Sequence, residues 1–303
     1  MTEGVLVMAY GTPGGPEDVE AYYTHIRRGR PPTPELLADL GRRYEAIGGI
    51  SPLARRTEAQ RAGIEAALHD RAPGRFAVVL GQKHAPPFIE DAVADLARAG
   101  VRRAVGLVLA PHYSRLSVGE YHERARTAGD AAGVELVPID DWHLEPAYLA
   151  FLERAVATGL SRLPARSRVL FTAHSLPERI LDEGDPYPVQ MRETAEAVAG
   201  RLDLREGSQW SLAWQSAAPT PEPWLGPDVR EVLRDLAGMV EGVLVCPAGF
   251  VADHLEVLYD LDIDARAVAE GAGLAFARTP SVNDDPGVLE ALAERLLTTI
   301  GPG

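Results

Sequence analysis

One histidine and, farther along the chain, a row of three carboxylates have types and positions that could do chemistry. His174 directly follows an apolar run, at the point where a strand would end. Glu256, Asp260 and Asp264 are spaced by four residues, so on one helix they would share a face. A row of carboxylates without a nearby lysine suits a hydrated divalent cation. Two simpler interpretations stay open: a histidine hydrogen-bonded within a turn, and a solvated acidic face on an acidic protein.

A basic stretch offers a second kind of chemistry. Its arginines lie between residues 27 and 56, at Arg27, Arg28, Arg30, Arg42, Arg43, Arg55 and Arg56. The forked donors of guanidinium groups match carboxylates, so this stretch could hold an anionic substrate. An alternative for Arg27 and Arg28 is that their charges complement a helix dipole.

The composition limits the classes of function. The chain has 303 residues, enough for two domains of about 150 residues each. Its formal net charge of -14 argues against nucleic acid as a partner. The single cysteine, Cys246, excludes a disulfide framework and a cysteine-ligated iron–sulfur site. No apolar stretch reaches the ~18 residues of a membrane span, so we expect a cytoplasmic protein without integral membrane association.

Secondary structure must position these side chains, and the chain alternates short apolar runs with longer amphipathic stretches. Strands are predicted at 4–9, 75–80, 104–109, 135–139, 168–172, 211–214, 242–246 and 274–277. Helices are predicted at 16–26, 34–46, 58–69, 88–99, 118–132, 146–161, 188–202, 228–236, 253–261 and 287–300. This alternation is typical of parallel α/β architecture.

The two halves of the chain resemble each other. Residues 5–13 and 169–177 each read as an apolar strand, then alanine, a polar ring, two residues and proline. We therefore predict two domains, 1–145 and 146–303, each a Rossmann-like parallel sheet flanked by helices. Ligands of such sheets bind at the carboxyl ends of strands, so Tyr10 and His174 would face each other across one cleft. Chance similarity of two strand–turn units is the alternative.

Motifs distributed along the chain make it similar to a known family. The matching stretches are 6–13 (LVMAYGTP), 22–30 (YYTHIRRGR), 43–53 (RYEAIGGISPL), 81–93 (GQKHAPPFIEDAV), 172–177 (TAHSLP), 184–188 (GDPYP), 220–229 (TPEPWLGPDV) and 249–260 (GFVADHLEVLYD). Together and in this order, they resemble the ferrochelatase family, specifically its soluble coproporphyrin III branch. The resemblance covers essentially the whole chain and implies a porphyrin cleft between two chelatase-type halves.

The resemblance implies roles for individual residues. His174 and Glu256 match the pair that binds the incoming metal and handles the porphyrin protons. Tyr10 matches the tyrosine on the opposite face of the macrocycle, which can ligate the product iron. Positions that match contacts to the porphyrin or its propionates are Arg27, Arg43, Tyr44, Ser51 and Tyr121. Asp260 and Asp264 match an acidic row that holds or delivers a second cation.

The resemblance also implies an activity, the insertion of Fe²⁺ into coproporphyrin III to give Fe-coproporphyrin III (coproheme) in heme biosynthesis. Fe²⁺ is then a substrate, and no cofactor is permanently bound. The 2Fe–2S cluster that many relatives carry is not expected on a chain with one cysteine. We expect a monomer that contacts a downstream coproheme-using enzyme only transiently.

Other functions stay open. The porphyrin could be protoporphyrin IX, although the four carboxylates of coproporphyrin suit the arginine-rich stretch better than two. The chain could instead be a non-catalytic porphyrin or heme carrier, or a cobalt or nickel chelatase. A sugar- or nucleotide-binding module is allowed by fold alone. Ala217 and Ala218 stand where related sequences have a glycine before the Thr-Pro pair, which leaves the contacts of that loop open.

Overall fold

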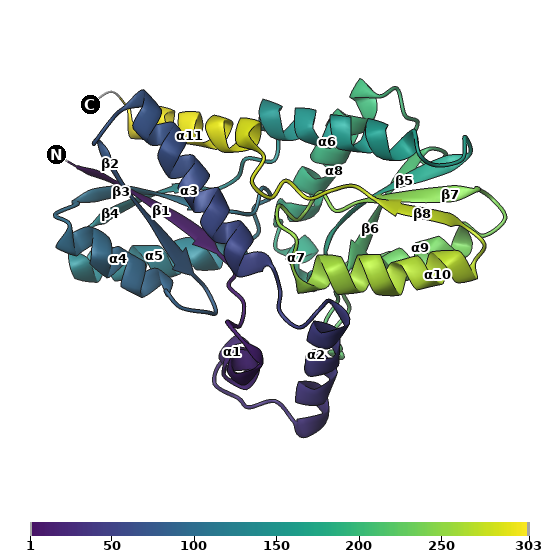
Figure 1. The fold of residues 1–303 in the computed structure, drawn as a ribbon, viewed down its shortest axis with the longest axis horizontal. Helices are drawn as coiled ribbons and strands as arrows, with labels where there is room; N and C mark the ends of the chain where they lie inside the picture. The colour runs from purple at the N-terminus through teal and green to yellow at the C-terminus, as the bar shows by residue number, and fades with distance from the viewer. Residues whose placement is uncertain (1, 302–303) are drawn as a thin grey trace. The chain divides into compact units, whose positions relative to one another are not determined.

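The computed structural model describes residues 2–301 and contains two compact units. Unit 1 holds the described chain through Trp142, together with Ala252–Leu255 and the chain from Asn283 onward. Unit 2 holds His143–Val251 and Glu256–Val282. The chain therefore passes from one unit to the other more than once, as its colour from end to end shows in Figure 1.

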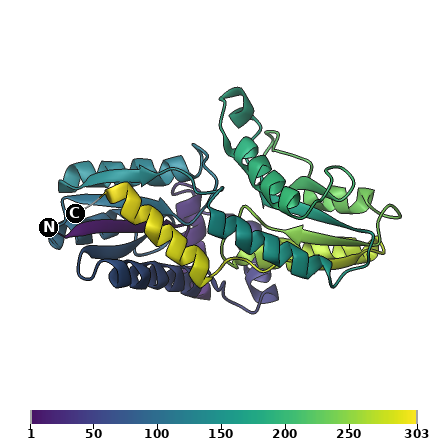
Figure 2. The same cartoon turned by 90° about the horizontal axis from the view of Figure 1, so that it is seen from above.

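Unit 1 is built on a parallel sheet with the strand order β2-β1-β3-β4. Its strands are β1 (Glu3–Ala9), β2 (Phe76–Gln82), β3 (Arg103–Val108) and β4 (Glu135–Ile139). Two pairs of helices cover its faces (Figure 1, Figure 2): α3 (Leu53–Arg71) with α11 (Pro286–Ile300), and α4 (Ile89–Arg98) with α5 (Val118–Ala132). Because both faces are covered, β1 is a continuous apolar run.

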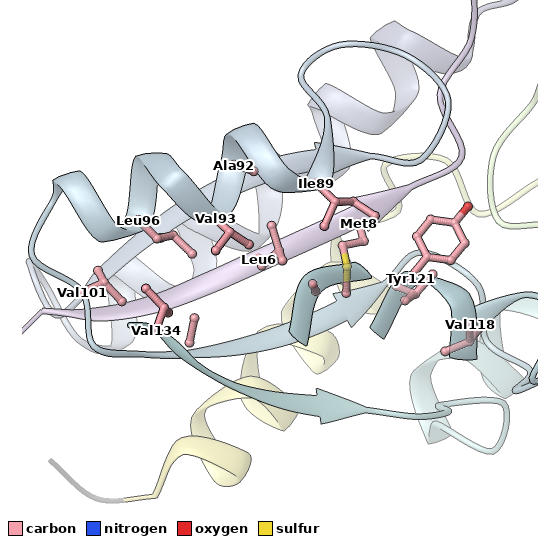
Figure 3. Close-up of a cluster of buried hydrophobic side chains, with 13 residues drawn as sticks. Leu6, Met8, Ile89, Ala92, Val93, Leu96, Val101, Val118, Tyr121 and Val134 are labelled. Atoms are coloured by element: carbon pink, nitrogen blue, oxygen red, sulfur yellow. The ribbon is translucent and has the colours of Figure 1, made fainter. Parts of the chain in front are cut away.

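The core between this sheet and the α4–α5 pair is largely aliphatic (Figure 3). Leu6 and Met8 of β1 belong to one buried cluster with Ile89 and Val93 of α4. Tyr121 of α5 is part of the same cluster. Burying a large apolar side chain contributes about 1.5–3 kcal/mol. The core therefore fixes the carboxyl end of β1, where the site residues of unit 1 begin.

The chain between β1 and α3 forms an arm. It contains a 3₁₀ turn (Pro16–Asp18), α1 (Val19–Ile26) and α2 (Pro34–Ala46), which lie away from the sheet in Figure 1. Val19 is the buried residue of α1, and Tyr44 is that of α2. With so little apolar burial, the arm belongs to the less stable parts of a fold, from which ligand-binding segments are drawn.

Helix α11 packs in unit 1 although it ends the described chain. Leu289 of α11 lies against Gly63 of α3, and an ideal Cβ on Gly63 would stand only 2.4 Å from Leu289 Cδ1. Glycine at this position lets the two helices approach closely. The predicted division at residue 145 assigns α11 to the second half. Residues 63 and 289 are far apart in the sequence, and no local pattern indicates that their helices pack together.

Unit 2 repeats the plan with the strand order β6-β5-β7-β8, again all parallel. Its strands are β5 (Ser167–His174), β6 (Trp210–Gln215), β7 (Gly242–Cys246) and β8 (Ala275–Arg278). Helices α6 (Pro146–Leu160) and α8 (Tyr187–Arg201) cover one face, and α9 (Val229–Asp235) and α10 (Arg266–Gly271) cover the other (Figure 1). The predicted fold class, two similar parallel α/β halves, is confirmed.

Some helices differ from their predicted bounds. The predicted helix 253–261 is a π-helix, η2 (Val257–Ala265), which continues into α10. Helix α3 begins earlier than predicted, at Leu53, whose N–H donates to Ser51 Oγ at 3.2 Å. The predicted helix 16–26 divides into the 3₁₀ turn and α1, and the short α7 (Arg179–Asp182) has no predicted counterpart. Across residues 2–301, no helix combines the length and apolar character needed to cross a bilayer.

Candidate active site

The main candidate site lies in unit 2, where His174 and Glu256 meet. His174 is the last residue of β5, and Glu256 directly precedes η2. The His174 Nε2 and Glu256 Oε2 atoms are 3.7 Å apart. Their side chains are 33% and 37% exposed, so a ligand can reach both.

The backbone determines which nitrogen of His174 can bind. Its Nδ1 lies 2.5 Å from the carbonyl oxygen of Ser175. A carbonyl oxygen only accepts, so Nδ1 carries the hydrogen and the neutral ring presents its lone pair at Nε2. The lone pair is therefore on the side of Glu256, as in sites where a backbone carbonyl orients a metal-binding histidine.

A buried tyrosine holds the backbone at His174. The Tyr187 hydroxyl donates to the His174 carbonyl oxygen at 3.0 Å. Burial raises the pKa of Tyr187 above its ordinary value, and the charges of Glu256 and Asp185 act in the same direction. The phenol therefore remains a hydrogen-bond donor across the physiological range of pH.

Gln215, at the end of β6, makes hydrogen bonds to the backbone of Glu256 and to β5, the strand that carries His174. Its Nε2 donates to the Glu256 carbonyl oxygen at 3.4 Å, and its Oε1 accepts from Thr172 Oγ1 at 2.9 Å. Its own carbonyl oxygen accepts from the Ser175 N–H at 2.7 Å. This buried side chain thus ties β5, β6 and the start of η2 together.

The loop after β7 approaches β5 closely. The Gly249 N–H donates to the Thr172 carbonyl oxygen at 3.0 Å. An ideal Cβ on Gly249 would lie 2.4 Å from the Ala173 Cβ, a distance that real side chains do not tolerate. Glycine therefore allows the segment that leads toward Glu256 to lie against the strand that carries His174.

Aromatic rings flank the imidazole. The ring centroids of Trp224 and Phe250 each lie 6.5 Å from that of His174. Trp224 is held by a hydrogen bond from its Nε1 to Thr220 Oγ1 at 2.8 Å. Aromatic faces of this kind suit a flat, largely apolar ligand.

The acidic row has partners of its own. Ser216 Oγ donates to Asp260 Oδ2. The raised pKa of Arg230 reflects its hydrogen bond to Asp228 first, and the charges of Asp264 and Asp260 after it. In the described part of the chain, no group of three or more histidine, cysteine, aspartate or glutamate side chains is arranged to hold a metal ion. A second cation at Asp260 and Asp264 stays a prediction.

In unit 1, Tyr10 directly follows β1 and is 41% exposed. Its ring contacts that of His84, with centroids 4.6 Å apart. The Nδ1 atoms of His84 and His25 are 3.0 Å apart. Burial, followed by the charge of Lys83, lowers the pKa of His84 to about 3. Tyr10 therefore lies against an uncharged imidazole.

Tyr121, on α5, is nearly enclosed, with 4% exposure. The Lys83 ammonium lies 5.1 Å from the centre of its ring and 2.5 Å from Glu120 Oε2. Arg28 approaches the other oxygen of Glu120 at 3.7 Å. Burial raises the pKa of Tyr121 well above its ordinary value, so the phenol stays neutral. Tyr121 thus lies under a charged pair, and its contact with a porphyrin stays a prediction.

The other predicted substrate residues lie on or beside the arm. Arg27 follows α1, and Arg43, near the end of α2, pairs with Asp39 at 3.0 Å. Both arginines are partly exposed. Tyr44 and Ser51 are buried, with 6% and 4% exposure, and Ser51 Oγ accepts from the Leu53 N–H at the start of α3. The arginines are therefore the accessible members of this group.

The structure brings part of the predicted site together. His174 and Glu256 meet within unit 2, and Tyr10 and Tyr121 both belong to unit 1. Tyr10 and His174 belong to different units, so a cleft with both residues in its walls stays a prediction.

Several neighbours of the candidate residues have no role in the sequence analysis. They are Lys83, His84, Tyr187, Gln215, Trp224 and Phe250. Lys83, His84 and Gln215 come at or just after strand ends, the positional signal that singled out His174. Lys83 is also the only lysine in a chain with 29 arginines. The aromatic neighbours lie in loops, helices or turns whose approach to His174 depends on the fold.

Comparison with known proteins gives a consistent result over the whole chain. The family model described as Ferrochelatase matches residues 2–299. The coproporphyrin III ferrochelatase of Oceanobacillus iheyensis is 44% identical over 297 residues, which cover 96% of this chain and 94% of that protein. The coproporphyrin III ferrochelatase of Bacillus subtilis strain 168 is 44% identical, covering 98% of each chain.

Solved structures share the fold at much lower identity. The chain aligns with CbiX, the terminal enzyme for siroheme biosynthesis in denitrifying bacteria, with a TM-score of 0.54, 18% identity and 96% coverage of each chain. It aligns with the cobalt complex of the sirohydrochlorin chelatase SirB from Bacillus subtilis subspecies spizizenii with a TM-score of 0.57 and 10% identity, covering 99% of this chain and 95% of that one. At these identities, the likeness concerns the fold alone.

Proposed function

The chain belongs to the ferrochelatase family, and on that premise we propose that it inserts Fe²⁺ into coproporphyrin III, releasing two protons and coproheme. The observation that carries this proposal is the accessible pair of His174 and Glu256, whose Nε2 and Oε2 atoms are 3.7 Å apart. An oriented imidazole beside a carboxylate supplies both a metal ligand and a proton acceptor.

Fe²⁺, the metal substrate, binds first to this pair. Donor atoms 3.7 Å apart can both contact one cation, because bonds from imidazole nitrogen and carboxylate oxygen to first-row metals are about 2.1 Å long. A mixed nitrogen and oxygen ligand set suits ferrous iron. His174 binds without losing a proton, since its Nδ1 hydrogen is held by the Ser175 carbonyl oxygen.

The exchange conserves charge. One dication enters the macrocycle, and the two pyrrole N–H protons leave it. Glu256 accepts a proton as its bond to the metal breaks, and His174 Nε2 accepts the second in the same way. Asp260 and Asp264, which follow Glu256 at intervals of four residues, carry these protons away or hold the next cation.

The arginines of the arm select the organic substrate. Arg27 and Arg43 bind carboxylates at the rim of the porphyrin, and the largely buried Tyr44, Ser51 and Tyr121 would contact it only through their small exposed areas. Coproporphyrin has four such carboxylates and protoporphyrin has two. Binding energy from the rim holds the macrocycle bent, which exposes nitrogen lone pairs to the metal.

Tyr10 lies on the opposite face of the macrocycle and ligates the iron of the product. Its support is its position directly after β1, equivalent to that of His174 directly at the end of β5. A tyrosine in place of a second histidine argues against a cobalt or nickel chelatase built on paired histidines.

Anaerobic incubation with coproporphyrin III and Fe²⁺, followed by visible absorption, tests the activity. We expect the four-banded spectrum of the free porphyrin to be replaced by that of coproheme. The His174→Ala variant should lose metal insertion and still bind the porphyrin, whereas His69→Ala, at an exposed position on α3, should behave as the native protein. Porphyrin binding without insertion by the native chain would identify a carrier. Faster turnover of protoporphyrin IX would overturn the choice of substrate.

We propose that the chain works without an iron–sulfur cluster. Such clusters need several thiolate ligands, and the sequence has one cysteine. Burial raises the pKa of the Cys246 thiol to about 12, so it is a poor ligand even alone. A monomeric, cytoplasmic enzyme that passes coproheme to a downstream enzyme by transient contact stays a prediction.

A further inference from the structure

Four rings follow one another in unit 1, starting at Tyr10. The Tyr10 and His84 rings have centroids 4.6 Å apart, and the His84 and His25 rings have centroids 5.2 Å apart in an edge-to-face arrangement. His25 then stacks on Phe88, again at 5.2 Å, with the two planes 24° apart. The exposed phenol is therefore the outer end of a row of aromatic contacts that leads back to the start of α4.

The inner end of this row is anchored. Phe88 immediately precedes α4, and its N–H donates to Asp91 Oδ2 at 3.1 Å. The first residue of α4, Ile89, is fully buried in the core of unit 1. The inner end of the row, Phe88, is thus held at the start of a helix whose position the core fixes.

The two histidines are joined by a direct hydrogen bond. Their Nδ1 atoms are 3.0 Å apart, which is the normal length for such a bond. One Nδ1 must carry a hydrogen and the other must accept it. This bond fixes the orientation of the His84 ring, because an imidazole turned over would place a carbon atom at the contact.

His84 also holds Tyr10 through the backbone. The His84 N–H donates to the Tyr10 carbonyl oxygen at 2.9 Å, which extends the pairing of β1 and β2 past the ends of both strands. The backbone of Tyr10 is thus fixed by the same residue whose ring contacts the phenol.

We propose that His84, oriented by His25, is a positioning residue that sets the direction of the Tyr10 phenol. This inference rests on the proposed role of Tyr10 as the axial ligand of product iron. A tyrosine has two side-chain torsions, and an exposed phenol loses binding energy when it must be ordered on each encounter. Contact with an oriented imidazole gives the ligand its direction before the macrocycle arrives.

The test uses ferric coproheme binding, followed by the charge-transfer absorption that an iron–phenolate bond produces. Tyr10→Phe should abolish this band. His84→Ala should reduce it and weaken coproheme binding at least fivefold, and His25→Phe, which keeps a ring in the row but removes the hydrogen bond, should show the same change to a smaller degree. His69→Ala is the matched control, with the native band expected.

A double variant separates positioning from general damage. If His84 acts through the phenol, His84→Ala should weaken binding no further in a chain that already carries Tyr10→Phe. Should His84→Ala fail to fold, His84→Phe keeps the packing and carries the same expectation. Additive losses, or a native band in both His84 variants, overturn the inference and leave the proposed function intact. A native band in Tyr10→Phe removes the axial role of Tyr10 from the proposed function and the inference with it.

Discussion

His174 and Glu256 are held in different ways. The His174 ring is oriented by the Ser175 carbonyl oxygen, and its backbone is held by Tyr187. Glu256 is held through its carbonyl oxygen, which accepts from Gln215, while its carboxylate reaches within 3.7 Å of the imidazole. A change in the Glu256 side chain therefore leaves the hydrogen bonds with Ser175 and Tyr187 that hold His174 available.

Replacing Glu256 by glutamine should separate binding from chemistry. Glu256→Gln keeps the size of the side chain but removes the proton acceptor, so kcat should fall by about 10²–10⁴. The Kd for coproporphyrin III, measured by fluorescence, should stay within a factor of two or three. Steady-state assays with Fe²⁺ measure the change in kcat. A kcat within tenfold of the native value would show that the protons leave by another route.

At the scale of elements, α4 and α5 are joined by a charged pair beside the site of unit 1. The Arg124 guanidinium donates to both oxygens of Glu90, at 2.8 and 2.7 Å. It also donates to the Lys83 carbonyl oxygen at 2.6 Å. One arginine of α5 therefore supports both α4 and the backbone that precedes His84.

This pair gives a pH-dependent contribution with a defined sign. The hydrogen bond from Arg124 holds the pKa of Glu90 below its ordinary value, so the contribution is present above the unfolded pKa of ~4.3 and is lost as the pH falls through the folded pKa. Because the Glu90 side chain is about half exposed, we expect Glu90→Gln to cost only about 0.5 kcal/mol at pH 7.

Urea denaturation of the native protein and of the Glu90→Gln variant, at pH 7 and near pH 3, measures the difference between their free energies of unfolding. It should shrink at the lower pH, because the native carboxyl takes up its proton as the pH falls through its lowered pKa. A difference as large at the lower pH as at pH 7 would mean that Glu90 stabilises the fold by packing and not by charge.

The η2 segment shows what a spacing rule can and cannot predict. The four-residue interval of Glu256, Asp260 and Asp264 predicts a shared helical face, and that interval is compatible with both an α-helix and a π-helix. The interval alone does not choose between them.

For the whole molecule, charge is distributed unevenly along the chain. The net charge is -14, yet arginines gather between residues 27 and 56. If these arginines bind the carboxylates of the porphyrin, the KM for coproporphyrin III should rise severalfold between 50 and 500 mM salt, because salt screens exposed charges.

Protoporphyrin IX, with half the carboxylates, should show a smaller rise in the same buffers, provided detergent is held constant. Arg43→Gln should reduce the dependence for coproporphyrin III. Equal salt dependence for both porphyrins would argue that the arginines do not contact the rim.

The sequence predicts well the features that local patterns encode. Apolar runs locate the strands, and the end of β5 identifies His174 as a candidate. The sequence does not reveal that Gln215 and Trp224 surround this histidine, because their approach depends on strand pairing and loop paths. The place of α11 depends on packing between Gly63 and Leu289, which no pattern of either helix shows.

Lys83 is the single lysine of the sequence, and its ammonium is largely enclosed between Glu120 and the ring of Tyr121. Apart from the terminal amino group, the protein therefore offers one primary amine to acylating reagents. That amine lies one residue from His84, whose ring contacts Tyr10. The rate at which a small activated ester labels the folded chain thus measures how accessible the Lys83 ammonium is between Glu120 and Tyr121, without any tag or introduced probe.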